Sequence, residues 1–304
     1  MSQRQISVQG PQREIAKKWR VTRLAWGLLL PSLIFLAIFT FYPIGYSVYM
    51  SFFKNNMATY ATGPQYIGLA NYITLFTQDK VFAASFRNNL IVAVVTVPTS
   101  IALGVAMAIF ANQVKVGKGA VRVSYFYPSL LPMVAVANIW LFIYTPMYGL
   151  LGYINPAWHF LTNPSTVLGA LIVMLIWKQA GYVMIFYISG LQNINSELYE
   201  AARIDGANAR QTFWKITWPM LKPTTLYVMI ITLTNAYKMV DHLYIMTKGG
   251  PGNSSNMLLF YVYQKAFDQS NTGMASAITV VLVVILLVIT CVQFFTQDKR
   301  IFYA

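Results

Sequence analysis

Apolar residues in this 304-residue chain occur in long blocks separated by shorter polar stretches. Residues 91–111 contain no charged side chain, and residues 280–289 consist only of Val, Ile and Leu. A helix of ~18 or more apolar residues, rising about 1.5 Å per residue, spans the ~30 Å hydrocarbon core of a bilayer. The pattern therefore predicts an all-α, polytopic membrane protein with about six transmembrane helices. Their expected ranges are 24–53, 86–111, 123–144, 167–191, 224–246 and 274–295.

Prolines and one long polar segment divide this apolar pattern. Pro31 and Pro43 are expected to bend or interrupt the first helix, and Pro128 and Pro132 the third. The polar segment, 192–222, separates the fourth helix from the fifth. The expected organisation is an N-terminal cytoplasmic tail (1–23), a transmembrane permease domain (24–296) and a short C-terminal cytoplasmic tail (297–304).

The composition argues against a water-soluble domain and against a metal site. Hydrophobic residues make up 57% of the chain and charged residues 10%, and the mean hydropathy is +0.53. A soluble domain of this size needs more charge to cover its surface. Cys291 is the single cysteine, so no intrachain disulfide or multi-cysteine metal site is available. His159 and His242 lie far apart in the sequence without supporting ligands.

The net charge of +14 is explained by the distribution of lysine and arginine between the predicted loops. Fifteen of these residues fall in the two tails, the turn after the second helix and the segment 192–222, and five fall in the alternate loops. Basic loops remain in the cytoplasm, so both termini are expected there. No nucleic-acid partner is expected, because the sequence contains no nucleic-acid-binding module and no pattern that predicts a basic groove.

The segment 192–222 has the pattern of an amphipathic helical hairpin. Ser196 is a suitable N-cap, and Glu197 is favoured near a helix N-terminus. Gly206 is expected to break the first helix because glycine tolerates the dihedral angles of a turn. Pro219 and Pro223 are expected to end the second helix before the fifth span. From the residue pattern alone, an ordinary interfacial loop explains the hairpin equally well.

The residues of this hairpin resemble the EAA loop of importer-type ABC transporter permeases. That loop reads Glu-Ala-Ala, three residues, Gly, nine residues, Ile, one residue and Leu-Pro, and Trp218 stands here in place of the Leu. In that family the loop is a coupling helix seated in a cleft of the ATPase subunit. The resemblance therefore implies an ATPase-coupling role, with Glu200 as polar anchor and Gly206 as the turn. The residues that carry it are Glu200, Ala201, Ala202, Asp205, Gly206, Ala207, Ile216 and Pro219.

Two shorter motifs resemble the carbohydrate-importer group of these permeases, of the maltose and glycerol-3-phosphate type. The first is Thr-Lys-Gly-Gly-Pro at 247–251, after the fifth predicted helix, and the second is Trp-Lys-Gln at 177–179. The resemblance implies the type I ABC importer permease fold and a role in sugar transport.

Polar and aromatic residues within the fourth and fifth predicted helices are the candidates for substrate binding. Polar groups in a span are costly and usually face a cavity or a partner, and aromatic faces beside hydrogen-bonding groups suit a sugar. The alternative is that they only pack against a partner permease or pair with each other, as Lys238 and Asp241 would in an ion pair. The candidates, several of them at positions similar to sugar-contacting ones in the maltose-type permease, are Trp177, Lys178, Gln179, Tyr182, Thr232, Asn235, Lys238, Met239 and Asp241.

The implied function is that of a permease subunit in an ATP-driven importer of a sugar or sugar-like solute. Lys178 and Lys238 keep an anionic solute, such as glycerol phosphate or a sulfonated or phosphorylated sugar, among the candidates. The chain has no Gly-x-x-x-x-Gly-Lys-Ser/Thr loop, so no enzymatic activity, catalytic residue or cofactor of its own is expected. ATP and Mg²⁺ are expected in the partner ATPase.

The implied assembly lies in a prokaryotic inner (cytoplasmic) membrane and contains several partners. These are a second permease subunit, two ATPase subunits and an extracytoplasmic solute-binding protein. The loops at 63–71, 148–164 and 249–256 are the candidates for contact with the binding protein. Whether the second permease is another copy or a different chain stays open, although the family favours a different chain. The alternative function, a secondary transporter or channel without ATP coupling, gives no reason for the EAA residues.

Overall fold

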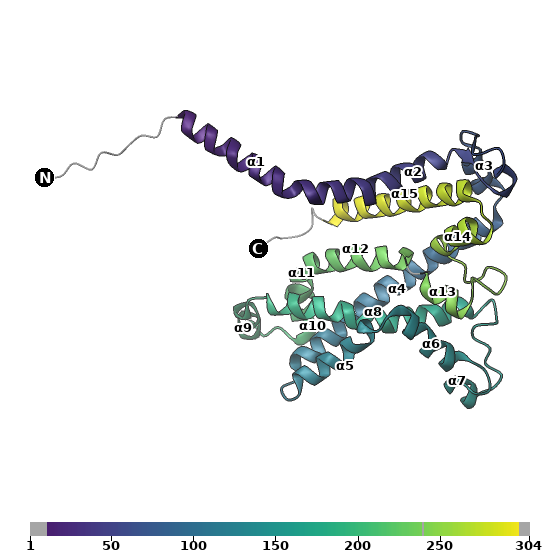
Figure 1. Cartoon of the computed structure of the whole chain (residues 1–304). Helices are drawn as coiled ribbons and strands as arrows, with labels where there is room; N and C mark the ends of the chain where they lie inside the picture. The colour runs from purple at the N-terminus through teal and green to yellow at the C-terminus, as the bar shows by residue number, and fades with distance from the viewer. Residues whose placement is uncertain (1–10, 239, 298–304) are drawn as a thin grey trace.

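The computed structural model describes residues 11–238 and 240–297 and is mainly helical (Figure 1). Its fifteen α-helices are α1 (Pro11–Leu36), α2 (Tyr42–Met50), α3 (Ala70–Thr77), α4 (Lys80–Gln113), α5 (Lys118–Leu130), α6 (Met133–Tyr144), α7 (Leu150–Ile154), α8 (Val167–Gln192), α9 (Ser196–Ile204), α10 (Ala209–Thr212), α11 (Trp218–Met220), α12 (Lys222–Lys238), α13 (Asp241–Met246), α14 (Leu258–Tyr263) and α15 (Thr272–Gln297). The two-residue strands β1 (Phe53–Lys54) and β2 (Gln65–Tyr66) pair antiparallel.

Four helical stretches of the described chain have the length and hydropathy needed to cross a membrane. They are Thr22–Met50, Lys80–Gln113, Val167–Gln192 and Thr272–Phe295. Helices α5 and α6 add a fifth when they are counted as one span bent by 94°. These five stretches cover the first, second, third, fourth and sixth predicted helices, and confirm a polytopic, all-helical membrane protein.

The helix that contains the first predicted span begins earlier than the apolar pattern indicated. Helix α1 begins at Pro11 and passes through Pro31, so the part of the predicted tail from Pro11 to Arg23 is helical. A π-helical segment, Ala37–Phe41, joins it to α2 immediately before Pro43. Figure 1 shows α1 extending away from the rest of the protein, with α15 along α2. The remaining parts of the predicted tails, at 1–10 and 298–304, lie outside the described residues.

The fifth predicted span is not one continuous helix. Helix α12 has 17 residues and ends at Lys238, and the short helix α13 begins at Asp241. The Nδ2 of Asn89 in α4 donates a hydrogen bond to the carbonyl of Ala236 in the last turn of α12, at 3.4 Å. Since the last carbonyls of a helix lack partners within it, this contact with α4 stabilises the end of α12.

Helices α4 and α8 pack along each other at the centre, and α12 lies against both. Close approach depends on small residues: a Cβ at Gly104 of α4 would overlap the side chain of Val183, and one at Gly181 of α8 would overlap the backbone of Tyr125 in α5. Buried apolar side chains form one cluster around α4, α8, α12 and α15 and a second around α6, α8, α13 and α14.

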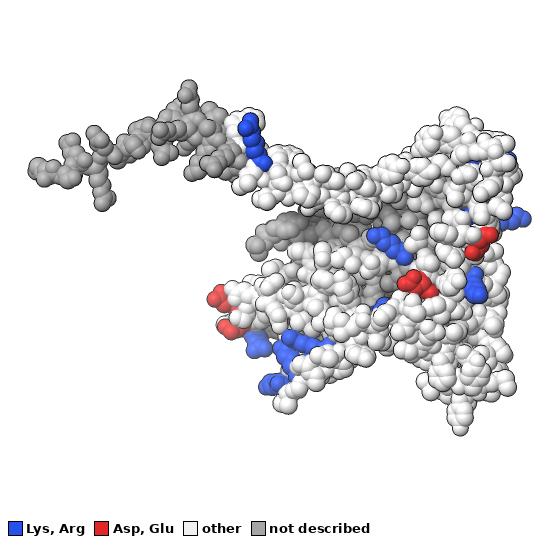
Figure 2. Space-filling view, viewed as in Figure 1, with Lys and Arg blue, Asp and Glu red and all other residues white. Residues whose placement is uncertain are grey.

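Charged side chains gather at the two ends of the body on the face seen in Figure 2, and a few more lie between them, near the junction of α12 and α13. One group covers α5, α9 and α10, and the other surrounds α13 and α14. The exposed surface between them is rich in large apolar side chains, such as Val123, Leu130 and Ile139. This distribution is expected of helices whose middle parts contact lipid.

Candidate functional site

The helical hairpin predicted from the polar segment is present, with a different N-cap. Helix α9 begins at Ser196, and the residue that caps it is Asn195. The Oδ1 of Asn195 accepts a hydrogen bond from the amide of Glu197 at 3.1 Å. The prediction that Ser196 is the N-cap was therefore wrong by one residue. Asparagine and serine bind the free amides of a helix N-terminus about equally well, so the sequence did not distinguish Asn195 from Ser196.

Gly206 ends α9 in a Schellman motif. Its φ of +73° lies in the left-handed region, which glycine adopts without a Cβ penalty. Its amide donates to the carbonyl of Arg203 at 3.1 Å, and the amide of Ala207 donates to that of Ala202 at 2.9 Å. The Glu-Ala-Ala-x-x-x-Gly spacing is thus the spacing of a helix and its C-terminal cap.

The second arm of the hairpin begins with a reciprocal cap and ends between the two predicted prolines. Asn208 caps α10, since its Oδ1 accepts from the amide of Gln211 and its own amide donates to the Oε1 of Gln211, both at 2.9 Å. A π-helical segment, Phe213–Thr217, leads into α11. Helical structure is continuous from Ala209 to Met220, so Pro219 lies in the last turn of the second arm. Pro223 is the second residue of α12, where a missing N–H costs no helical hydrogen bond. The second arm therefore ends between the two prolines, before the fifth predicted span.

The two faces of α9 differ in burial. Tyr199 and Ala202 face the protein: Ala202 is buried, and the hydroxyl of Tyr199 lies 3.2 Å from that of Thr217 in the second arm. Glu200, Ala201, Asp205 and Gly206 are exposed, whereas Ala207, Ile216 and Pro219 are half-buried. Large apolar side chains are exposed beside them, with Leu198 at 41%, Trp214 at 57% and Ile204 at 87%. The outer face of the hairpin is therefore a mixed apolar and acidic surface that nothing in the described chain covers.

Lys178, the first charged candidate for substrate binding, contacts the backbone at the bend between α5 and α6. Its Nζ donates a hydrogen bond to the carbonyl oxygen of Leu131 at 2.6 Å. Leu131 follows the last residue of α5 and precedes Pro132, so its carbonyl lies where the helical hydrogen-bond pattern is broken. The ammonium group therefore satisfies a free carbonyl of the broken span, a contact that the sequence pattern did not predict.

The structure brings together part of the predicted substrate set between α8 and α12. The Nε2 of Gln179 is 3.5 Å from the carbonyl oxygen of Thr232, and both residues are buried. They are not open to a solute in this structure. Trp177 is 40% exposed and packs edge-to-face on Trp140 of α6, with ring centroids 5.6 Å apart. Tyr182 packs in the same manner on Phe186, at 4.9 Å.

The remaining candidates lie around the break between α12 and α13. Asn235 is half-buried, and Lys238 and Asp241 are both exposed. Within the described part of the chain, no ion pair joins Lys238 to Asp241, so the predicted alternative of mutual neutralisation is not observed. Asp241 lines a cleft of about 330 Å³ together with Tyr244 and Tyr263. Met239 lies outside the described residues.

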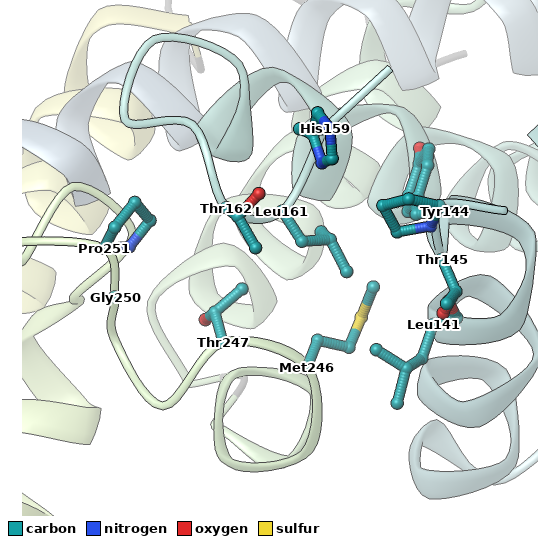
Figure 3. A pocket seen from close by; sticks show the side chains of 11 residues that line it. Leu141, Tyr144, Thr145, His159, Leu161, Thr162, Met246, Thr247, Gly250 and Pro251 are labelled. Atoms are coloured by element: carbon teal, nitrogen blue, oxygen red, sulfur yellow. The ribbon is translucent and has the colours of Figure 1, made fainter. Parts of the chain in front are cut away.

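A second cavity, which the sequence did not predict as a site, lies at the end of the molecule opposite the hairpin. Its volume is about 390 Å³. Figure 3 shows the side chains of Leu141 and Tyr144 from α6, His159 and Thr162 from the following loop, and Met246 from α13 around a common space. The loops at 148–164 and 249–256 both contribute to its wall. Both loops were predicted from the sequence as candidates for contact with the binding protein, but not as the walls of one cavity.

The Thr-Lys-Gly-Gly-Pro motif forms the other wall of this cavity and is held by hydrogen bonds. The hydroxyl of Ser255 donates to Thr247 Oγ1 at 2.8 Å and lies 2.6 Å from the carbonyl oxygen of Gly250. The Nδ2 of Asn88, a buried residue of α4, donates to the carbonyls of Asn253 and Asn256, both at 2.9 Å. The motif is therefore a compact loop tied to the central helix.

Comparison with known proteins identifies the class. Residues 100–301 match the family described as binding-protein-dependent transport system inner membrane component. The chain belongs to this family and is an ABC transporter permease of the carbohydrate-importer type. The relatives are transport permeases, in agreement with a membrane subunit that is not an enzyme.

Several relatives are similar over nearly their whole length. The chain is 34% identical to the probable ABC transporter permease protein YurN of Bacillus subtilis, with 90% of this chain and 96% of YurN covered. It is 30% identical to the sn-glycerol-3-phosphate transport system permease protein UgpA of Agrobacterium fabrum, with 92% and 96% covered. The sulfoquinovosyl glycerol transport system permease protein SmoG of the same organism is 31% identical, with 88% of each chain covered.

Solved structures agree with the fold. A bacterial ABC transporter involved in the import of the acidic polysaccharide alginate has a chain that matches with a TM-score of 0.80 and 24% identity, covering 94% of this chain and 99% of that one. A bacterial alginate ABC transporter in complex with an alginate pentasaccharide-bound periplasmic protein matches with a TM-score of 0.79 and 25% identity, with 95% and 97% covered. The predicted importer permease fold is confirmed.

Proposed function

We propose that this chain is the membrane permease of an ATP-driven importer whose outer α9–α10 surface docks on a separate ATPase subunit. The exposed Glu200, Ala201 and Ile204 on the outer face of α9 are the observation that carries the proposal. Large exposed apolar side chains beside an acidic residue are expected of a surface that a partner covers. The caps at Asn195 and Gly206 and the Tyr199–Thr217 contact make the hairpin a rigid unit, which suits transmission of a force.

The remaining partners follow from this role. Two clefts of an ATPase dimer require two docking hairpins, so a second permease subunit completes the assembly. ATP and Mg²⁺ bind in the ATPase subunits. A solute-binding protein delivers the solute at the face that carries the 390 Å³ cavity, a role supported by the alginate transporter that was solved with its periplasmic protein. The proposed location is a prokaryotic inner membrane with both termini in the cytoplasm, which places the basic end of the body and the hairpin on the ATP side.

The proposed solute is a sugar or a sugar-like molecule, with anionic sugars and glycerol phosphate derivatives among the candidates. Relatives are named for glycerol 3-phosphate and sulfoquinovosyl glycerol. The exposed Trp177, Lys238 and Asp241, together with Tyr182, Asn235 and Met239, are proposed to line its path. Three further candidates are proposed to hold the helices around that path instead of contacting the solute. Lys178 joins α8 to the end of α5, and Gln179 joins α8 to α12 through Thr232.

A transport assay with the assembled importer tests the path. Lys238→Gln removes a charge from an exposed position, so uptake of an anionic solute is expected to fall at least several-fold more than uptake of a neutral sugar. Lys54→Gln, at an exposed lysine of β1 outside the proposed path, is the matched control. Equal uptake in both variants, for both solutes, contradicts the proposed path.

A further inference from the structure

Two tyrosine side chains form a corner in the cleft beside the break between α12 and α13. The rings of Tyr244 in α13 and Tyr263 in α14 lie edge to face, with centroids 5.8 Å apart and planes at 80°. Tyr263 also stacks on Phe260 at 6.0 Å and packs against Phe267 at 5.1 Å, so its ring is held in place. Tyr244 is 52% exposed and Phe267 is 72% exposed. The corner therefore presents open aromatic surface, where α13 lies beside α14 in Figure 1.

The carboxylate of Asp241 belongs to the wall of the same cleft. Asp241 is exposed and has no ion-pair partner within the described part of the chain. It falls inside the fifth predicted span, where an ionisable group is costly unless it faces a water-filled cavity or a partner. Besides the tyrosines, the cleft is lined by the apolar Val134, Val240 and Ile245. The carboxylate is thus the one charged group among the described residues that line the cleft.

An aromatic corner beside a carboxylate has the chemistry that binds a neutral sugar ring. The C–H groups of a pyranose pack on an aromatic face, and a carboxylate accepts hydrogen bonds from the hydroxyls. The cleft volume of about 330 Å³ lies at the lower end of the range for small-molecule sites, about 300–1,000 Å³, and so suits a single ring. A carboxylate or phosphate on that ring would be repelled by Asp241, because like charges placed together are unfavourable.

Helix α13 places this cleft next to the outer cavity. Asp241 and Tyr244 line the cleft, whereas Met246 at the other end of α13 lines the 390 Å³ cavity. We propose that Asp241, Tyr244 and Tyr263 form a subsite of the solute path that binds a neutral sugar ring. The ring lies on the two tyrosines, and its hydroxyls donate to the carboxylate of Asp241. The subsite rests on the proposed transport function and narrows its solute class, because any acidic group of the solute must lie outside this cleft.

Saturation-transfer NMR tests the subsite on the assembled importer in lipid nanodiscs, without added solute-binding protein. The probes are the neutral methyl glycosides of glucose and galactose, each compared with its uronate, in which the primary alcohol is oxidised to a carboxylate. The wild-type complex is expected to transfer saturation to the ring protons of a neutral glycoside, and about fivefold less to its uronate. Asp241→Asn is expected to raise the uronate signal toward that of the neutral glycoside.

The tyrosine variants test the aromatic contact. Tyr244→Ala and Tyr263→Ala are each expected to lower the neutral signal about fivefold, whereas Tyr244→Phe keeps the ring and most of the signal. Tyr60→Ala is the matched control, because Tyr60 is 89% exposed and lies outside the proposed path. It is expected to leave every signal unchanged.

Three results overturn the proposal. They are the absence of a neutral signal in the wild type, equal neutral and uronate signals in the wild type, and a neutral signal unchanged by both tyrosine-to-alanine variants. If those variants fail to assemble, Asp241→Asn decides, because it replaces an exposed side chain by one of the same shape, and an unchanged ratio of the two signals overturns the subsite. Binding needs no ATP coupling, so Glu200→Ala is expected to keep the signals. Failure of the subsite beside normal ATP-driven uptake is therefore distinct from failure of the proposed function.

Discussion

The ammonium of Lys178 in α8 binds the carbonyl oxygen of Leu131, 47 residues earlier, at the point where α5 and α6 bend by 94°. At the bend, the carbonyl of Leu131 lacks the backbone donor that a continuous helix would provide. Lys178 of the neighbouring helix α8 supplies a donor in its place. A residue that the sequence indicated as a ligand for the solute therefore has a structural contact of its own.

Replacement of Lys178 by methionine is expected to destabilise the bend. The carbonyl of Leu131 would lose its partner, at a cost of about 1–3 kcal/mol. Thermal unfolding of the assembled complex should show a lower midpoint, and uptake of neutral and anionic solutes should fall together. Lys178→Arg keeps a donor and is the control. Loss of anionic uptake alone, with unchanged unfolding, would instead favour direct recognition of the solute.

Gly181 and Gly169 provide a matched pair within α8. A Cβ at Gly181 would overlap the carbonyl of Tyr125, whereas one at Gly169 would meet nothing within 4 Å. Gly181→Ala is expected to cost about 1–3 kcal/mol, because α5 must move away from α8. Gly169→Ala is expected to be neutral or slightly stabilising, since alanine is the better helix former. Chemical or thermal unfolding of the two variants distinguishes them, and similar destabilisation by both would contradict the close packing of these helices.

Asn89 joins the break after α12 to the start of α14. Its Oδ1 accepts from the amide of Leu258 at 2.8 Å, and its Nδ2 donates to Ala236. Asn89→Ala leaves buried backbone groups without partners and is expected to cost about 1–3 kcal/mol. Asn138→Ala is the control, because the Asn138 amide is exposed and donates to Val134 in its own helix. Equal unfolding midpoints for both variants would contradict this role of Asn89.

The fold was more predictable from the sequence than its tertiary contacts. The apolar runs identified five stretches of spanning length, and the Glu-Ala-Ala-x-x-x-Gly spacing identified the turn at Gly206, because both depend on residues close together in the chain. The hydrogen-bond partners of Lys178, Asn88 and Asn89 lie 47 or more residues away in the sequence. The spacing of apolar and polar residues does not predict contacts over such distances. The break between α12 and α13 was missed for the same reason, since the side chain that binds the end of α12 is Asn89 of α4.

Gly206 is expected to tolerate asparagine better than alanine. Its Cβ position is open, so the cost of Gly206→Ala is that of a left-handed residue, about 1 kcal/mol. Asparagine adopts this conformation more readily. Hydrogen exchange at the amide of Ala207 should therefore accelerate more in Gly206→Ala than in Gly206→Asn, and uptake should follow the same order. Protection unchanged by either substitution would contradict the Schellman cap.

The central claim is that the outer face of α9 couples this permease to an ATPase. The direct measurement is solute-dependent ATP hydrolysis and uptake by the importer in proteoliposomes, with Glu200→Ala compared with Asp268→Ala, an exposed acidic residue after α14, at the opposite end of the body. Loss of uptake by tenfold or more in Glu200→Ala, with normal folding and with Asp268→Ala near wild type, is the predicted result. Normal coupling in Glu200→Ala, and in a variant whose residues 198–206 are replaced by a flexible linker, would contradict it.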